Sequence, residues 1–245
     1  MIEIRDVSKI YRSARGEIHT IDGISFSAQP GEFVSIIGPS GCGKSTLLKI
    51  IGDIIEPSRG SVMVDGLTSR EARLKGMFSY VFQNPVLLPW RRVVDNVRLP
   101  LEILPTHSRD PVELLQMVGL SGFENRYPSE LSGGMQHRAA LARALTFDPR
   151  ILLMDEPFGA VDELTRDNLN VELLRIWMEI KVTIFFVTHS INEAVFLSDR
   201  VLLLGGRPAG IKQFAEISFK RPRQNSLKNT HEFQEVVRCL REELN

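Results

Sequence analysis

The segment of this sequence best equipped for chemistry is Gly38–Thr46, which reads GPSGCGKST. It matches the spacing G-x-x-x-x-G-K-[ST], in which glycines let the backbone curl and turn successive N–H groups toward an anion. Lys44 supplies a mobile charge for the β- and γ-phosphates, and the Ser45 hydroxyl suits a Mg²⁺ ion between them. The segment predicts a site for a nucleoside triphosphate; the alternative is a glycine turn that matches by chance.

Two apolar segments frame this loop. Phe33–Ile37 is short and β-branched, which predicts a buried strand, and Leu47–Ile51 opens a helix whose N-terminus favours anions. The thiolate of Cys42 is favoured at such a helix start, the alternative being a small buried thiol. The residues expected on the nucleotide are Gly38, Ser40, Gly41, Cys42, Gly43, Lys44, Ser45 and Thr46.

A second apolar strand, Ile151–Asp155, leads into two adjacent carboxylates. Two acids at the end of a buried strand are costly unless they meet a cation or hydrogen-bond donors, which disfavours the alternative of a solvated turn. Asp155 is suited to hold Mg²⁺ through water, and Glu156 to accept a proton from a water attacking the γ-phosphate. With the glycine loop, these acids predict hydrolysis of the triphosphate.

Polar residues also follow two further predicted strands. Gln83 follows Met77–Phe82, and side chains at the carboxyl ends of strands face the ligand in an open α/β sheet. His189 follows Val182–Thr188, where its imidazole is placed to hydrogen-bond the γ-phosphate. Each has a plainer alternative, a loop glutamine and a capping histidine. We predict both as catalytic residues because of the glycine loop and the paired acids beside them.

A second glycine-bearing helix start lies at Leu131–Gln136, which reads LSGGMQ. Ser132 is a favourable N-cap, and Gly133 and Gly134 leave the start of the predicted helix Gln136–Leu145 open to a phosphate. Alone, a Gly-Gly helix start is weak evidence for a ligand. Two such starts in one chain favour an arrangement in which the second serves the nucleotide of another copy.

The composition indicates a globular protein whose charges produce no strong overall electrostatic field. Of 245 residues, 43% are hydrophobic, and 30 Lys and Arg balance 30 Asp and Glu. This balance disfavours nucleic acid as a partner. The longest apolar runs are strand-sized, well short of the ~20 residues of a membrane span. The chain begins with a strand pattern and has only Cys42 and Cys239, so we expect a cytosolic protein with free thiols.

The remaining segments organise the chain around these sites. Residues 2–37 alternate apolar and polar positions between glycine turns, which predicts antiparallel strands. Tyr11 in this region is placed either to stack on adenine or to be partly buried. The strand pattern is absent over about residues 85–145, which predicts a helical insertion. Trp90, between a proline and two arginines, is either a core residue or an exposed contact.

Together these motifs resemble those of the nucleotide-binding subunits of ATP-binding cassette (ABC) transporters. The resemblance runs from about residue 1 to residue 205, and the order and spacing of its motifs are highly specific. The matching motifs are Walker A at Gly38–Thr46, the Q-loop residue Gln83, the signature at Leu131–Gln136, Walker B at Ile151–Asp155 with Glu156 following, the D-loop residue Asp162 and the switch histidine His189. The signature separates this family from kinases and GTPases.

The resemblance implies an ABC ATPase fold of the α/β class, with a P-loop NTPase core, an antiparallel β subdomain and an α-helical insertion subdomain. It implies ATP and Mg²⁺ as cofactors, and two subunits paired head to tail so that the signature of one closes on the ATP of the other. Around Mg²⁺ it places Ser45, Gln83 and Asp155, and on the nucleotide it adds Tyr11, Ser132, Gly133, Gly134 and Asp162.

Walker A, Leu87–Trp90 and Gly159–Arg166 resemble more finely the branch that serves importers of nitrate, sulfonate and taurine. This implies an ATPase peripheral on the cytoplasmic face of the inner membrane. Its implied partners are transmembrane permease subunits, a second ATPase subunit in a homo- or heterodimer, and indirectly a solute-binding protein. His137 departs from the pattern, since Gln is commoner there. The alternative functions are the ATPase of an exporter or of a soluble assembly machine.

We predict an ATPase domain over residues 1–220, with its helical subdomain at about residues 85–145, and a linker with a short helix over residues 221–245. The basic segment Lys220–Arg223 is expected to be a solvated linker, the alternative being a contact with lipid headgroups. The stretch Glu232–Leu244 is typical of an amphipathic helix.

Overall fold

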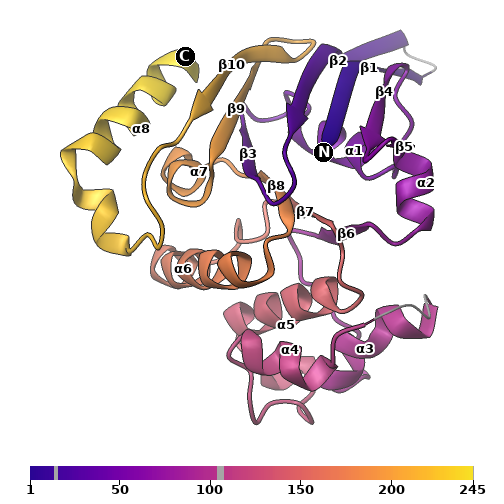
Figure 1. Cartoon of the computed structure of the whole chain (residues 1–245), viewed down its shortest axis with the longest axis vertical. Helices are drawn as coiled ribbons and strands as arrows, with labels where there is room; N and C mark the ends of the chain where they lie inside the picture. The colour runs from indigo at the N-terminus through magenta and orange to yellow at the C-terminus, as the bar shows by residue number, and fades with distance from the viewer. Residues whose placement is uncertain (14–15, 104–107, 245) are drawn as a thin grey trace.

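The computed structural model describes residues 1–13, 16–103 and 108–244, which form two β-sheets with surrounding helices (Figure 1). The larger sheet has six strands in the order β10-β9-β3-β8-β7-β6, all parallel except β10. Its strands are β3 (Phe33–Ile37), β6 (Phe78–Val81), β7 (Ile151–Asp155), β8 (Thr183–Val187), β9 (Arg200–Gly205) and β10 (Gly210–Glu216). This confirms the predicted α/β class.

The six-stranded sheet is covered on both faces, since its central strands are apolar throughout. All five residues of β3 and all five of β8 are buried. Successive side chains of a strand point to opposite faces, so Ile184 and Phe186 join one hydrophobic cluster while Phe185 and Val187 join another. The helices that cover the sheet in the first cluster include α6 (Glu163–Ile180), α7 (Ile191–Leu197) and α8 (His231–Leu244), and α1 (Lys44–Ile51) contributes to the second cluster (Figure 1).

The smaller sheet is antiparallel, in the order β2-β1-β4-β5, and it also contributes to the second cluster. Its strands are β1 (Ile2–Ser13), β2 (Gly16–Ala28), β4 (Arg59–Val64) and β5 (Leu67–Thr68), followed by α2 (Ser69–Leu74). The backbone N–H of Asp22 donates to the Ala209 carbonyl oxygen (3.0 Å), which ties β2 to the loop after β9. The antiparallel strands predicted for residues 2–37 are confirmed for β1 and β2, whereas the last segment of this range, β3, pairs in parallel within the large sheet.

The predicted helical insertion is also confirmed, and it lies at one end of the core (Figure 1). Its helices are α3 (Val93–Ile103), α4 (Pro111–Met117) and α5 (Gly133–Leu145). The helix predicted to open at Gln136 begins at Gly133 instead. The cause is the cap: the Ser132 hydroxyl accepts a hydrogen bond from the backbone N–H of Met135 (3.3 Å), which starts the helix directly after Ser132.

The prediction of a solvated linker at Lys220–Arg223 is wrong for its two arginines. Arg223 is 4% exposed, and Arg221 donates to the Leu197 carbonyl oxygen at the end of α7 (2.7 Å). The last carbonyls of a helix have no intrahelical partner, so a buried guanidinium satisfies them. Burial lowers the pKa of Arg223 to about 10. The carbonyl groups that Arg223 contacts in this region are those of Val195, Phe196 and Ser198.

The predicted C-terminal helix is confirmed as α8, whose apolar face packs on the core through Phe233, Val237 and Leu240. The two cysteines are free, Cys42 buried and Cys239 exposed. Among the described residues, no helix has the length and apolar character that crossing a membrane requires.

Candidate active site

The glycine loop between β3 and α1 wraps around a cavity of about 220 Å³. Lys44 is buried, and its ammonium donates to the carbonyl oxygens of Gly38 (2.9 Å) and Pro39 (3.1 Å). Within the described part of the chain no carboxylate pairs with this ammonium. A buried cation without a counter-ion favours an anion beside it. The cavity is lined by Thr20, Ser40, Gly41, Gly43, Lys44, Ser45, Thr46, Glu156 and His189.

Beside the loop, the structure brings together Ser45 and Asp155, which the sequence places on different elements. The Ser45 hydroxyl lies 2.8 Å from Asp155 Oδ1, and the Tyr80 hydroxyl donates to Asp155 Oδ2 (3.2 Å). Burial, reinforced by the Asp155 carboxylate, raises the pKa of Tyr80, so its phenol stays protonated and donates. A hydroxyl and a carboxylate are the hard oxygen ligands that Mg²⁺ prefers, so this pair fits the predicted metal.

Glu156 and His189 form the second pair at this cavity. His189 Nε2 lies 2.5 Å from Glu156 Oε1, and the Glu156 side chain is 19% exposed. The backbone N–H of Glu156 donates to the Val187 carbonyl oxygen (3.0 Å), which fixes the acid at the end of β8. Glu156 has a φ of 49°, a left-handed conformation that is strained for a side chain of this size. The structure therefore holds this carboxylate at the loop against a backbone preference.

Gln83 lies in the loop after β6 and outside this cavity. Its Nε2 lies close to Gly159: a Cβ added to that glycine would be 3.2 Å from Gln83 Nε2. Arg143 of α5 holds the same loop, because its guanidinium donates to the carbonyl oxygens of Pro85 (2.9 Å) and Val86 (2.8 Å). The structure records no contact of Gln83 with Ser45 or Asp155, so its place at the metal stays a prediction.

Neither Tyr11 nor Cys42 lines the phosphate cavity. Tyr11 is 41% exposed on β1, with the Lys9 ammonium 5.2 Å from its ring centroid. The side chain of Cys42 is 2% exposed and belongs to the core, so the structure favours the buried-thiol alternative. A cavity of about 560 Å³ adjoins the phosphate cavity and shares Thr20 and Gly41 with it. Its lining is Ile18, His19, Thr20, Gly41, Cys42, Arg207 and Pro208.

The signature residues lie in a different place, and none of them lines the phosphate cavity. Ser132 and Gly133 are exposed at the start of α5, and Ser132 and Gly134 line a separate cavity of about 290 Å³. Asp162 caps α6 by accepting from the backbone N–H of Thr165 (3.0 Å), a hydrogen bond that lowers the pKa of this carboxyl. The cavity at Ser132 and Gly134 is also lined by Met135, Arg138, Thr165, Asn168, Leu169 and Glu172.

Sequence reasoning missed several residues that the structure places at the site. Tyr80 has a weak sequence signal, because it stands one residue before the end of β6, close to where polar side chains face the site. Thr20 and Arg143 have none, since only the tertiary fold brings them to the loops. Glu193 is buried in the first turn of α7. In the sequence it has the position of the acid in a helix cap, which gives no sign of a role near His189.

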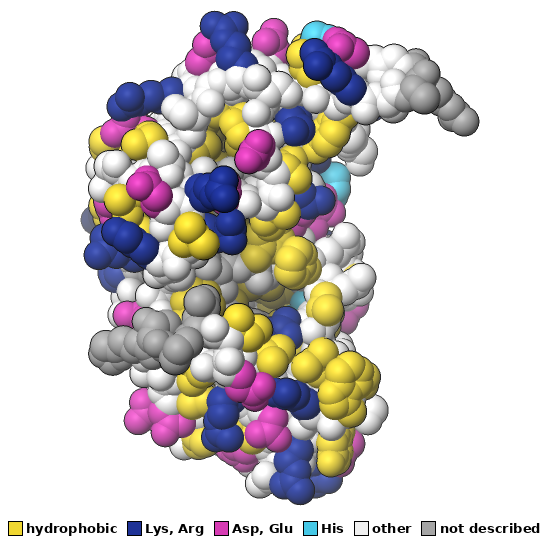
Figure 2. Space-filling model, turned by 90° about the vertical axis from the view of Figure 1, so that its right-hand side faces the viewer, with side chains coloured by type: hydrophobic (Ala, Val, Ile, Leu, Met, Phe, Trp, Pro, Cys, Tyr) yellow, Lys and Arg dark blue, Asp and Glu magenta, His cyan; other side chains and the backbone are white. Residues whose placement is uncertain are grey.

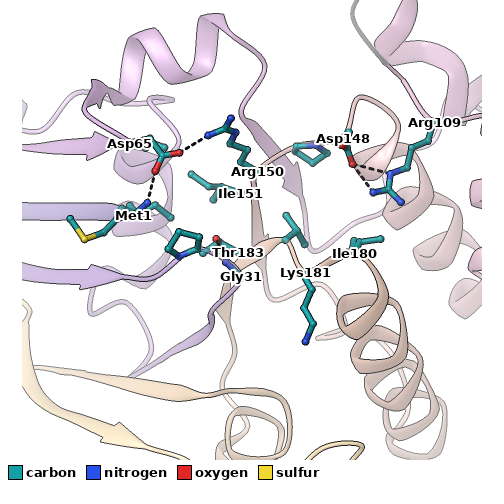
Figure 3. A pocket seen from close by; sticks show the side chains of 15 residues that line it. Met1, Gly31, Asp65, Arg109, Asp148, Arg150, Ile151, Ile180, Lys181 and Thr183 are labelled. Atoms are coloured by element: carbon teal, nitrogen blue, oxygen red, sulfur yellow. Dashed lines mark hydrogen bonds and ion pairs between the residues drawn. The ribbon is translucent and has the colours of Figure 1, made fainter.

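A further cleft, of about 530 Å³, lies at the opposite edge of the large sheet (Figure 3). Ile151 and Thr183, the first residues of β7 and β8, line it, whereas the glycine loop follows the last residue of β3. Two of its arginines are paired with carboxylates, since Arg109 lies 2.7 Å from Asp148 and Arg150 lies 2.7 Å from Asp65 (Figure 3). The cleft therefore holds no chemistry comparable with that of the glycine loop.

The sequence and the fold resemble those of known proteins. The family model described as "ABC transporter" matches residues 21–159. The aliphatic sulfonates import ATP-binding protein SsuB of Bacillus cereus is 42% identical, over 96% of this chain and 92% of that protein. The nitrate import ATP-binding protein NrtD of Synechococcus elongatus is 42% identical, over 89% of this chain and 81% of that protein.

Among solved structures, one match is the dimeric structure of a post-hydrolysis state of the ATP-binding cassette MJ0796 bound to ADP and Pi. It superposes with a TM-score of 0.77 at 32% identity and covers 90% of this chain and 100% of that one. The similarity therefore extends over the core, the antiparallel sheet and the helical insertion together.

Proposed function

This chain belongs to the ABC transporter family, and on that premise we propose that it is the ATP-hydrolysing subunit of an importer for a small solute of the nitrate, sulfonate or taurine kind. Relatives named for sulfonate and nitrate import cover nearly the whole chain, which supports the solute class. In this proposal residues 1–220 form the ATPase domain, residues 221–245 extend it, and the subunit sits on the cytoplasmic face of the membrane.

The first half of the catalytic site is the glycine loop with its two acids. Lys44 and the loop N–H groups bind the phosphates, and Ser45 and Asp155 would hold Mg²⁺, with Gln83 joining them. When bound, Mg²⁺ neutralises charge on the β- and γ-phosphate oxygens. Glu156 acts as general base and takes the proton of the attacking water. His189, which lies 2.5 Å from that carboxylate, orients it and bonds the γ-phosphate.

The second half of the site comes from another subunit. The observation that carries this step is that Ser132 and Gly134 line a cavity that shares no residue with the phosphate cavity. Their exposed helix start therefore serves a nucleotide bound to a second copy, as the dimeric form of the MJ0796 cassette supports. Asp162 lies beside this surface, at the start of α6.

A permease is proposed to dock where the helical insertion meets the core. Trp90 is 72% exposed, and Phe82 and Val86 are also exposed around Gln83. Hydrophobic side chains are visible at this junction (Figure 2). Exposed aromatic residues of this kind mark protein interfaces. Movement of this loop, which Arg143 ties to α5, would transmit dimer closure to the membrane partner. Co-purification with a polytopic membrane protein separates an importer or exporter from a soluble machine.

Complementation of two inactive variants tests the shared site. Lys44→Ala disables the first half of a site and Ser132→Ala the second half, so each homodimer has two defective sites. In a mixed dimer the two substitutions fall in the same site, and the other site is intact. We expect ATP hydrolysis to reappear when the two purified variants are mixed, with mixtures of each variant and a Lys44→Ala, Ser132→Ala double variant as controls.

Recovered activity above these controls supports the shared site. If the mixture stays as inactive as its components although the two variants form mixed dimers with ATP, each site is complete within one chain and the proposal fails.

A further inference from the structure

The turn that carries His189 is tied to a buried carboxylate on the next helix. The Thr188 hydroxyl donates to Glu193 Oε2, and the backbone N–H of Ser190 donates to Thr188 Oγ1 (3.0 Å). In return, the backbone N–H of Glu193 donates to the Ser190 hydroxyl (3.2 Å). These three hydrogen bonds close a ring around residues 188–193, and His189 is the side chain that this ring presents to the site.

The position of Glu193 departs from an ordinary helix cap. In a capping box, the third helical residue returns its carboxylate to the backbone N–H of the cap residue. Here that N–H, on Ser190, is bonded to Thr188 instead, and the Glu193 carboxylate reaches past His189 to the Thr188 hydroxyl. The carboxylate therefore fixes the residue before His189, while its helix fixes the residue after it.

Keeping this carboxylate in the core is costly. Glu193 is 5% exposed, and burial raises the pKa of its carboxyl, against the opposing effects of Thr188, Asn170, Arg166 and Lys228. Its Oε1 and the Nε of Arg166 are buried without a hydrogen-bond partner. An apolar residue would avoid these costs if α7 required only packing.

Glu193 also lies next to the catalytic pair. One cavity of about 270 Å³ is lined by Glu156, His189, Arg166 and Glu193 together with four neighbours. A loss of the Glu193 carboxylate thus frees the turn on the side where His189 meets Glu156. A small displacement at such a contact is enough to lower a rate strongly.

We propose that Glu193 is a positioning residue for ATP hydrolysis, which holds His189 against Glu156 through the Thr188 hydroxyl. The inference rests on the proposed function of His189 and names a residue that acts through it. Glu193 makes no contact with the nucleotide in this scheme, so its loss changes the rate of hydrolysis and leaves nucleotide affinity in place.

The test compares Glu193→Ala, Glu193→Gln and Thr188→Val in the full-length protein, in kcat, KM and the affinity for a fluorescent ATP analogue. We expect Glu193→Ala and Thr188→Val to lower kcat ~10- to 100-fold with unchanged analogue affinity. Glu193→Gln keeps an acceptor for the Thr188 hydroxyl, and we expect it to restore most of kcat. Glu32→Ala is a matched control, because Glu32 is a carboxylate of similar burial that pairs with Arg200 away from the site.

A double-variant cycle separates positioning from a loss of fold. On a His189→Ala background, Glu193→Ala should have almost no further effect on kcat, because the side chain that it positions is gone. Equal fold-losses with and without His189, or a normal kcat in both Glu193→Ala and Thr188→Val, would overturn the inference alone. A normal kcat in His189→Ala would instead overturn the proposed role of His189, and the inference with it.

Discussion

The two glycine-bearing helix starts of this molecule are built in opposite ways. In the loop before α1, a Cβ on Gly38 would lie 2.6 Å from the Leu204 carbonyl oxygen and 2.9 Å from Cys42 Sγ. At the start of α5, a Cβ on Gly133 would meet nothing within 4 Å. Lys44 is buried in the first loop, whereas Ser132 is exposed beside the second. The first glycine loop is packed by its own chain. The second is open at Gly133, although a Cβ on Gly134 would lie 3.1 Å from the Thr165 side chain.

In the proposed dimer, this difference explains how one ligand site is divided between two subunits. A loop that encloses a buried charge needs the surrounding strands to hold it in place, and the core of this chain supplies them. A helix start that meets a ligand only when two copies close has to stay open in the single subunit, since any side chain covering it would block the approach. We infer that Gly38 serves tight packing in the first loop and that Gly133 keeps the second helix start accessible.

The largest expected effect comes from the acid of the first half-site. Glu156→Gln removes the proposed general base and keeps the shape of the side chain, so we expect kcat to fall ~10²- to 10⁴-fold with ATP affinity retained. Because neither glycine loop changes, ATP should hold the two half-sites together, and size-exclusion chromatography should show a dimer that depends on ATP. Turnover at the normal rate would refute the role of Glu156, and a strictly monomeric variant would refute the divided site.

A matched pair of substitutions tests the comparison directly. Gly38→Ala places a methyl group against the Leu204 carbonyl, and we expect it to lower the free energy of unfolding by ~1–3 kcal/mol. Gly133→Ala has open space, so we expect the isolated subunit to unfold and to bind ATP normally. Its ATP turnover should nevertheless fall, since the added methyl group lies between the helix start and the nucleotide of the other subunit. Thermal unfolding, ATP binding and turnover are measured on both variants.

The opposite pattern would break the comparison. If Gly133→Ala destabilised the subunit as much as Gly38→Ala does, the second loop would be a packing element like the first. If Gly133→Ala hydrolysed ATP at the normal rate, its open surface would have no part in the reaction.

Much of the fold and of the first half-site could be predicted, because they depend on local patterns. The apolar runs of β3, β7 and β8 predict buried strands, and polar residues at their ends predict one shared edge. The structure places Ser45 near Asp155 and Glu156 near His189 at that edge. These pairs follow because the carboxyl ends of parallel strands lie at the same edge of the sheet, and the sequence shows a glycine loop and two polar strand ends that meet there.

Other features could not be predicted, because their cause lies far away in the sequence. The run Lys220–Arg223 has the composition of a solvated linker. Contacts distant in sequence explain why Arg223 is buried and Arg221 half-buried: carbonyl groups at the end of α7 accept from both, and Arg221 also pairs with Asp199. The hydrogen-bonded ring that joins Glu193 to Thr188 is local in sequence. Its proposed role in positioning His189 depends, however, on the burial of Glu193, which the sequence does not show. Ser132 and Gly134 lie apart from the phosphate cavity, so one chain by itself does not show what the signature motif binds.

The smallest expected effect concerns the helix of the second half-site. His137 of α5 is buried, its ring centroid lies 6.1 Å from that of Phe158, and its Nδ1 is buried without a hydrogen-bond partner. Burial lowers the pKa of His137. Below the ordinary histidine pKa of about 6.5 the unfolded chain therefore binds a proton that the folded chain does not, and stability falls as the pH is lowered.

Replacing His137 with Gln removes this proton-binding difference, so the loss of stability between neutral pH and pH ~5 should be smaller in His137→Gln than in the native chain. His231, with an 85% exposed side chain, gives a matched control: His231→Gln should follow the native curve. Melting temperatures of the three proteins measured across this pH range test the prediction. Parallel curves of melting temperature against pH for all three would contradict it. A smaller slope in His137→Gln alone would locate acid sensitivity in the helix that carries the signature, leaving the glycine loop of the core unaffected.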